Sequence, residues 1–153
     1  MRVYLDACCL NRLTDDHSQL RVRREAEAVV DILRMIREGR TTWVSSRVLE
    51  VEIGRNPDIE RRQDVAAMLA LANEIVSPER AETDRALCLE ELGFSAFDAL
   101  HLACAERGTV EVFFPTDDNL LRRAGRHKQV LRIRVENPLF WYQELPGCRR
   151  SRK

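Results

Sequence analysis

The chain has 153 residues, of which 44% are hydrophobic and 33% charged, a balance that predicts one soluble globular domain with a sizeable core. Its 25 basic residues equal its 25 acidic residues, which excludes a global positive field for nucleic acid. No apolar run approaches the roughly 20 residues of a membrane span, and the start turns acidic too early for a signal peptide. We expect a cytoplasmic protein with a single domain over residues 1–147 and a mobile basic tail at 148–153.

The five cysteines form no CxxC pair, which argues against a disulfide framework and against a zinc site. Cys104 is expected to be a small core residue. Cys8 and Cys9 flank the predicted end of a strand, where a reactive thiol stays an open alternative.

The first predicted element is a buried strand at residues 2–6, which ends in Asp6. Open α/β sheets bind ligands at the carboxyl ends of their strands, so an acid at this point suggests a site. A solvated aspartate at the start of a loop is the alternative. After a polar segment at 10–20, apolar residues recur every three or four positions, which predicts a helix over 21–38 that Gly39 ends.

A second strand is predicted at residues 41–45, followed by a short helix that Ser45 or Ser46 can cap. Glu50 and Glu52 lie two residues apart in this helix, so they point to different faces. Only one of the two can easily face inward, and the other is expected to be a surface charge.

Two proline motifs predict the next helices, because a polar cap followed by proline is a common helix start. The first helix begins at 56–58 and extends to about residue 72, and the second begins at 77–79 and extends to about residue 92. Residues 73–76 between them form a short strand candidate.

Residues 95–105 form a helix that is apolar almost all the way round, and such a helix is normally buried. Asp98 lies in its first turn, where a buried carboxylate needs a partner, hydrogen bonds or a cation. A capping box with Ser95 is the alternative explanation for Asp98. His101, one turn further on, could approach the same site, although a buried histidine with a satisfied hydrogen bond is the simpler interpretation.

A third strong strand is predicted at 110–114, leading to Asp117 and Asp118 at the start of a short helix, where capping is again the alternative role. Residues 130–135 alternate as an edge strand does, and a last helix covers 137–145. Strands that alternate with helices predict a parallel sheet covered by helices on both faces.

Such a sheet would gather the acids that follow its strands at one edge. Carboxylates packed together repel one another unless a cation neutralises them. Oxygen ligands suit Mg²⁺ or Mn²⁺ better than zinc. The sequence has no P-loop, GxGxxG or GxSxG motif, which argues against nucleotide binding by those routes and against a serine hydrolase elbow.

The order of these motifs resembles the PIN domain family, and most of all its stand-alone bacterial and archaeal members akin to VapC toxins. The resemblance covers nearly the whole chain, and its most specific part is the DALHLA segment at residues 98–103. It also rests on Leu5-Asp6, the serine-led helix with two glutamates, and Thr116-Asp117-Asp118. The fold it implies is a three-layer α/β/α sandwich with a central parallel sheet of 4–5 strands.

The resemblance implies an endoribonuclease that uses Mg²⁺ or Mn²⁺ to hydrolyse RNA phosphodiester bonds. The catalytic and metal-binding acids of the family match Asp6, Glu52, Asp98 and Asp117. Glu52 is preferred because it lies six residues beyond Ser46, and Glu50 is the runner-up. The resemblance further implies a homodimer and a small antitoxin that covers the site. RNA would contact local arginine clusters at 21–24, 122–128 and 149–153.

Three positions depart from the family pattern. Ala7 and Cys8 stand where many members carry hydroxyl or amide groups, and Pro115 takes a position that is usually threonine. These departures motivate an alternative function, a PIN-like RNA- or protein-binding module whose catalysis is weak or lost. A Mg²⁺ phosphotransferase of the haloacid dehalogenase type is disfavoured, because Asp6-Ala7-Cys8 lacks the required DxD.

Overall fold

The centre of the computed structural model, which describes residues 1–147, is a five-stranded sheet in the order β3-β2-β1-β4-β5. Every neighbouring pair of strands is parallel, so the predicted parallel sheet of 4–5 strands is confirmed. The strands are β1 (Arg2–Leu5), β2 (Thr42–Ser46), β3 (Glu74–Val76), β4 (Val112–Phe114) and β5 (Arg134–Val135). The predicted basic tail at 148–153 lies outside the described residues.

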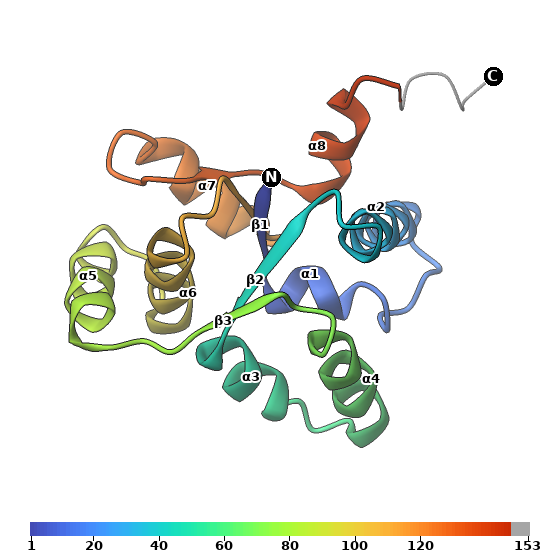
Figure 1. Cartoon of the computed structure of the whole chain (residues 1–153), viewed down its shortest axis with the longest axis horizontal. Helices are drawn as coiled ribbons and strands as arrows, with labels where there is room; N and C mark the ends of the chain where they lie inside the picture. Colours follow the sequence, from blue (N-terminus) through green and yellow to red (C-terminus); the bar gives the residue numbers. More distant parts are fainter. Residues whose placement is uncertain (148–153) are drawn as a thin grey trace.

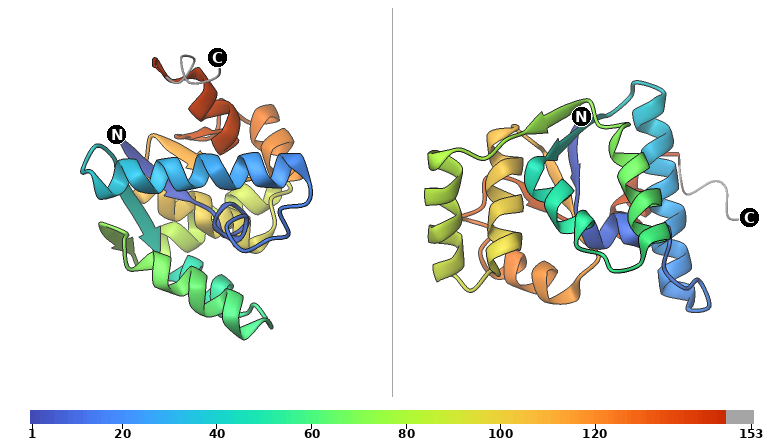
Figure 2. Two further views of the ribbon diagram at one scale, coloured as in Figure 1. Left: turned by 90° about the vertical axis from the view of Figure 1, so that its right-hand side faces the viewer. Right: turned by 90° about the horizontal axis from the view of Figure 1, so that it is seen from below.

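Helices cover both faces of the sheet, as Figures 1 and 2 show. One face carries α5 (Arg80–Glu91), α6 (Ala96–Arg107) and α7 (Asp118–Arg126). The other face carries α1 (Ala7–Asn11), α2 (Leu20–Arg37), α3 (Arg47–Gly54), α4 (Ile59–Leu69) and α8 (Pro138–Glu144). The result is the predicted α/β/α sandwich.

The central strands supply side chains to two separate cores, because successive residues of a strand point to opposite faces. In β1, Val3 and Leu5 pack into the core under α2, whereas Tyr4 packs into the core under α6. Tyr4 stacks on Phe113 of the neighbouring strand, with 5.1 Å between the ring centroids. Burial on both faces explains why β1 is an apolar run without alternating polar residues.

Helix α6 is buried as its sequence predicts, and residues on several of its sides are inaccessible to solvent. It ends at Gly108, where the chain passes very close to β2. A Cβ atom at this position would lie only 2.7 Å from Val44 Cγ1, so the close approach requires glycine.

Several element boundaries differ from the sequence predictions. The predicted polar segment at 10–20 overlaps a helix, α1, that had not been expected; it places Cys8 and Cys9 in a helix. A helix of five residues is too short to show a helical repeat in the sequence. The predicted strand at 130–135 is reduced to β5, because residues 130–133 form turns and bends.

The proline motifs mark turns before the helices and are not their first turns. Helix α4 starts after Asp58, whose side chain caps it, while the Asn56 side chain accepts a hydrogen bond from the Asp58 backbone N–H at 3.0 Å. Helix α5 starts after Glu79, which forms a capping box with Glu82. Polar side chains that bond to nearby backbone groups compete in this way with helix formation.

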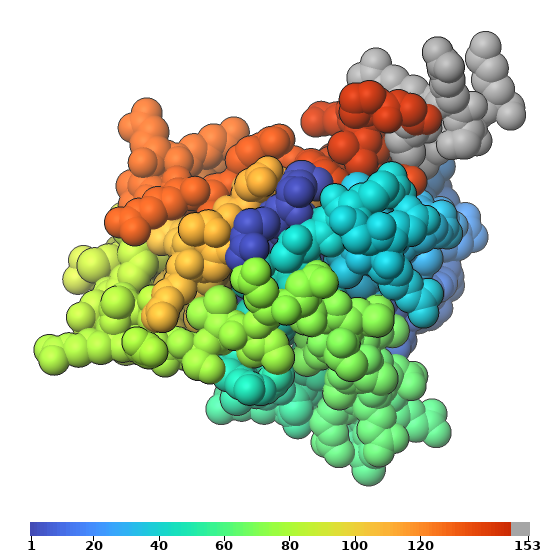
Figure 3. Space-filling model, viewed as in Figure 1, coloured from blue at the N-terminus to red at the C-terminus, as the bar shows by residue number. Residues whose placement is uncertain are grey.

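The start of the chain lies at the amino ends of the strands, on the side of the sheet opposite to their carboxyl ends. Figure 3 shows it between the segments around residues 40 and 108. The Arg2 side chain donates a hydrogen bond to the Gly108 carbonyl at 3.0 Å and another to Glu74 at 2.9 Å. Among residues 1–147, none of the helices combines the length and apolar character that a membrane crossing requires.

Candidate metal centre

Three strand-to-helix junctions lie at the carboxyl edge of the sheet, and a polar side chain caps the helix at each. Asp6 follows β1 and accepts a hydrogen bond from the Ala7 N–H at 2.9 Å. Ser46 ends β2 and accepts from the Leu49 N–H at 3.1 Å. Asp117 follows β4 and caps α7. Because β2, β1 and β4 are adjacent and parallel, these junctions lie at one edge.

The group best suited to bind a metal ion consists of Asp6, Glu52 and His101. One potential ligand atom from each lies within 4.8 Å of the other two. The side chain of Asp6 is buried, that of His101 is fully buried, and that of Glu52 is 30% exposed. Glu52 therefore lies on the solvent side of the group, where an ion can enter.

His101 is held by hydrogen bonds on both sides of its ring. Its Nε2 lies 2.9 Å from Glu52 Oε2 and 3.7 Å from Asp6 Oδ1. Its Nδ1 lies 2.6 Å from the Tyr4 hydroxyl, which in turn lies 2.7 Å from the Ser46 hydroxyl. The sequence had suggested only that His101 might approach the site, from its place one turn after Asp98.

Negative charge accumulates at this corner of the molecule. Burial raises the pKa of Asp6, and the charge of Glu52 adds to the effect. Burial and the charge of Asp6 raise the pKa of Asp98 to about 6. Asp98 therefore lies close enough to Asp6 for the two carboxylates to interact. Burial alone would lower the pKa of His101, but the hydrogen bond to Glu52 and the surrounding carboxylates raise it. Each shift is the one expected where several carboxylates lie close together in a largely buried site.

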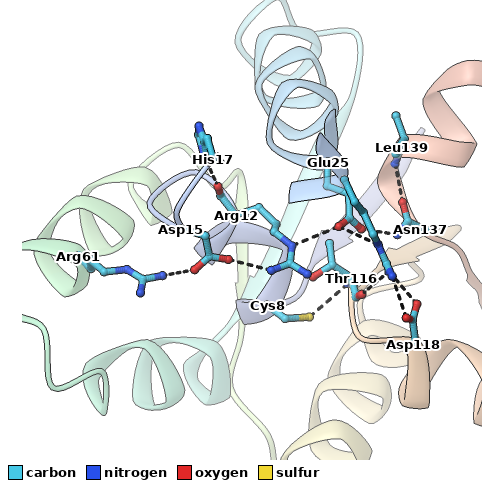
Figure 4. Close-up of polar contacts among 11 residues, drawn as sticks. Cys8, Arg12, Asp15, His17, Glu25, Arg61, Thr116, Asp118, Asn137 and Leu139 are labelled. Carbon is cyan, nitrogen blue, oxygen red and sulfur yellow. Dashed lines mark hydrogen bonds and ion pairs between the residues drawn. The ribbon is translucent and has the colours of Figure 1, made fainter. Parts of the chain in front are cut away.

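Cys8 supports Asp6 directly. The Cys8 thiol donates to Asp6 Oδ2 at 3.3 Å. Its sulfur accepts from the Thr116 N–H at 3.3 Å, the contact that Figure 4 shows. Burial raises the pKa of the Cys8 thiol well above its ordinary value, so the thiol stays protonated at neutral pH. A protonated thiol is a poor nucleophile, which disfavours the reactive-thiol alternative. Residues 1–147 contain four cysteines, all free.

The other candidate acids lie outside this group. Glu50 faces solvent and pairs with Arg47 at 2.9 Å. Asp117 is exposed, and its Oδ1 accepts from the Asn119 N–H at 2.7 Å. Asp118 is also exposed and pairs with Arg21 at 2.7 Å (Figure 4). The structure therefore brings Asp6 and Glu52 together, with Asp98 nearby, and leaves Asp117 as a helix cap.

A second buried carboxylate, Glu25 of α2 (Figure 4), lies near Cys9, where burial, Asp6 and Glu25 all raise the pKa of the thiol. Its Oε1 lies 3.3 Å from Arg12 Nε and 3.3 Å from Arg21 Nε. Its Oε2 accepts from the Asn137 side chain at 2.5 Å. One member of the predicted basic cluster at 21–24, Arg21, is thus engaged with protein carboxylates.

Among known proteins, residues 3–126 of the chain match the PIN domain family. The fold is similar to a chain of VapBC2 from Rickettsia felis, in a structure with a DNA fragment from their promoter, at a TM-score of 0.60 and 14% identity. It is also similar to a chain of VapBC-1 from nontypeable Haemophilus influenzae, at a TM-score of 0.57 and 14% identity. Both similarities cover 90% of this chain and 98% of the other. No curated protein sequence matched.

Proposed function

Since the chain belongs to the PIN domain family, we propose that it is a metal-dependent endoribonuclease and the toxin of a type II toxin–antitoxin pair. The observation that supports this most is the group of Asp6, Glu52 and His101, with Asp98 beside it. Within the described residues, no arginine or lysine forms an ion pair with any of these three carboxylates. A divalent cation would supply the charge that the protein does not.

Asp6, Glu52 and Asp98 are the proposed ligands, and their oxygen donors fit Mg²⁺ or Mn²⁺. Asp117 is proposed to contribute through water, because its Oδ1 caps α7. When bound, the ion would stabilise negative charge on the scissile phosphate and acidify a water molecule. The chain's own carboxylates would hold the ion, and one of them would orient that water.

The proposed partners are an RNA substrate, a small antitoxin that covers the site, and a second copy of the chain in a homodimer. The similar chains come from structures that are titled VapBC complexes, which supports a partner protein of this kind. Arginines that are not bound to protein carboxylates in Figure 4, such as those of the cluster at 122–128, would contact the RNA backbone. The affinity for RNA would therefore fall as the salt concentration rises. The proposed location is the cytoplasm.

The test is cleavage of total cellular RNA by the purified, antitoxin-free protein with Mg²⁺ or Mn²⁺, and with EDTA. Asp98→Asn keeps the side-chain shape and removes the charge. Glu52→Gln and Glu50→Gln form a matched pair, because the two glutamates lie on the same helix and only Glu52 bonds to His101. We expect discrete metal-dependent fragments from the wild type and from Glu50→Gln, and none from the other two variants.

Two results would contradict the proposal. Cleavage that persists in EDTA or in Asp98→Asn would show that the carboxylate group is not the catalytic centre. RNA that a folded wild-type protein binds without cutting would identify the chain as a binding module.

A further inference from the structure

A chain of hydrogen bonds links Glu52 to the interior of the molecule through His101, Tyr4 and Ser46. His101 and Tyr4 have no measurable exposure, and neither does Ser46. These residues come from α6, β1 and β2, so the chain of hydrogen bonds connects three elements that surround the site. Three polar side chains in the core, those of His101, Tyr4 and Ser46, are costly unless each is satisfied.

When the His101 ring is neutral, one arrangement of protons satisfies all of these groups. The Glu52 carboxylate can only accept, so the 2.9 Å contact requires a proton on His101 Nε2 in either charge state of the ring. In the neutral ring, Nδ1 then accepts from the Tyr4 hydroxyl at 2.6 Å. The Tyr4 oxygen accepts from Ser46 at 2.7 Å, and the Ser46 oxygen accepts from the Leu49 N–H.

This arrangement leaves His101 Nε2 without a free lone pair for a metal ion. The ring is also fixed in place, because it packs edge-on against Tyr4, with ring centroids 5.7 Å apart, and near Phe97 at 6.3 Å. By contrast, Glu52 is a long, partly exposed side chain, and the histidine bonds to its Oε2 and not to its Oε1. A buried donor therefore restrains a partly exposed carboxylate.

We propose that His101 is a positioning residue, which holds the Glu52 carboxylate ready for a divalent ion and is itself held by Tyr4 and Ser46. The proposal rests on the proposed function, because it assigns Glu52 to the ion. It makes the site an oxygen-only site, with the imidazole outside the coordination sphere. Groups that orient metal ligands in this way typically contribute about 10–100-fold to metal affinity.

The experiment measures Mn²⁺ binding to the metal-free protein by calorimetry, without RNA. His101→Leu removes the donor, and we expect the dissociation constant to rise by about 10–100-fold. His101→Gln can place its amide N–H where Nε2 was, and should restore most of the affinity. Tyr4→Phe keeps the ring that stacks on Phe113 and should weaken binding by about 10-fold, at the lower end of that range.

Thr41→Val is the matched control for loss of a buried hydroxyl. Thr41 is buried just before β2, at the opposite edge of the sheet, and its hydroxyl has no partner. The affinity of the Thr41→Val variant for Mn²⁺ should equal that of the wild type. If His101→Leu does not fold, Tyr4→Phe against Thr41→Val still decides the question.

Two further measurements separate positioning from other roles. In a Glu52→Gln background, His101→Leu should cause no additional loss of Mn²⁺ affinity, since His101 acts through Glu52. Pulsed electron paramagnetic resonance of the Mn²⁺ complex should show no directly bound nitrogen. A nitrogen ligand, additive losses, or unchanged affinity in His101→Leu and Tyr4→Phe would overturn the proposal. A wild type that binds no Mn²⁺ would instead overturn the proposed function, and this inference with it.

Discussion

Two buried carboxylates lie near each other in this protein, and their surroundings are opposite. Glu25 contacts two arginines and an asparagine, whereas Asp6 contacts a backbone N–H, a thiol and a histidine. The charge of Glu25 is balanced within the protein. Asp6 instead lies near a second carboxylate, and burial together with the charge of Glu52 raises the pKa of Asp6. We infer that the first carboxylate stabilises the fold and that the second is kept for a ligand.

The largest expected effect comes from Asp6→Asn, which tests the ligand side of this comparison. Asparagine also caps helices well, so the fold should be retained. Losing a charged metal ligand removes several kcal/mol of transition-state stabilisation, so metal-dependent RNA cleavage should fall by about 100-fold or more. Initial cleavage rates in Mn²⁺ measure this, with circular dichroism as the control for folding. A rate within about threefold of wild type would remove Asp6 from the proposed centre.

Glu25→Gln tests the structural side. It leaves Arg12 and Arg21 without their shared carboxylate in a buried position. Removing one partner of a buried ion pair typically costs 3–5 kcal/mol, and we expect about 2–3 kcal/mol because both arginines partly reach water. Urea unfolding measures the free-energy change. The Mn²⁺ affinity of the folded variant should not change, and a large loss of affinity would show that the two carboxylates are not separate.

Asp98→Asn should act on stability in the opposite direction. The pKa of Asp98 is raised from 3.8 to about 6, so the folded protein binds more protons than the unfolded chain between these values. The contribution of this group to the free energy of unfolding therefore falls as the pH rises through this range. At pH 7 without metal, Asp98→Asn should be more stable by about 1–2 kcal/mol, allowing for partial solvent screening.

Urea unfolding in EDTA at pH 7 and at about pH 3 or below measures this difference. The gain should vanish at the lower pH, where the wild-type carboxyl group is protonated in both states. A gain that is equal at both pH values would come from packing and not from charge.

The smallest effects should separate Asp117 from its neighbour Asp118. Asp118 is paired with Arg21, and the hydrogen bond from Arg21 lowers the pKa of Asp118. Asp118→Asn should leave the cleavage rate unchanged. Asp117→Asn retains the helix cap and should reduce the rate by about 10-fold, as expected for an outer-sphere contribution. Cleavage kinetics of both variants in Mn²⁺ distinguish the two, and equal rates would remove Asp117 from the site.

The layers of the fold could be predicted from the sequence, because the strands are short apolar runs and most helices carry a clear apolar repeat. Parallel pairing then followed from their alternation, and with it the proximity of acids such as Asp6 and Asp98. The order of the strands could not be predicted, since it depends on which elements pack together. Helix α1 was missed because five residues cannot show a helical repeat.

The role of His101 was also beyond the reach of sequence reasoning. Its partners Tyr4 and Glu52 lie 97 and 49 residues away along the chain and come from β1 and α3. The contact depends on the register of β1 against β2 and on the depth of α6. The choice between Glu50 and Glu52 was open for the same reason, since helical geometry shows only that they face different ways.

The separation of these residues has a consequence for how the protein folds. Asp6, Glu52 and His101 meet only after β1, α3 and α6 have assembled, and such long-range contacts form late because closing large loops costs entropy. An ion at this centre would then bind the native state and hardly stabilise the transition state for folding. Divalent ions would slow unfolding and leave the refolding rate nearly unchanged, which stopped-flow kinetics with and without Mn²⁺ would measure. The metal would thus act on the lifetime of the native state and not on how quickly the chain reaches it.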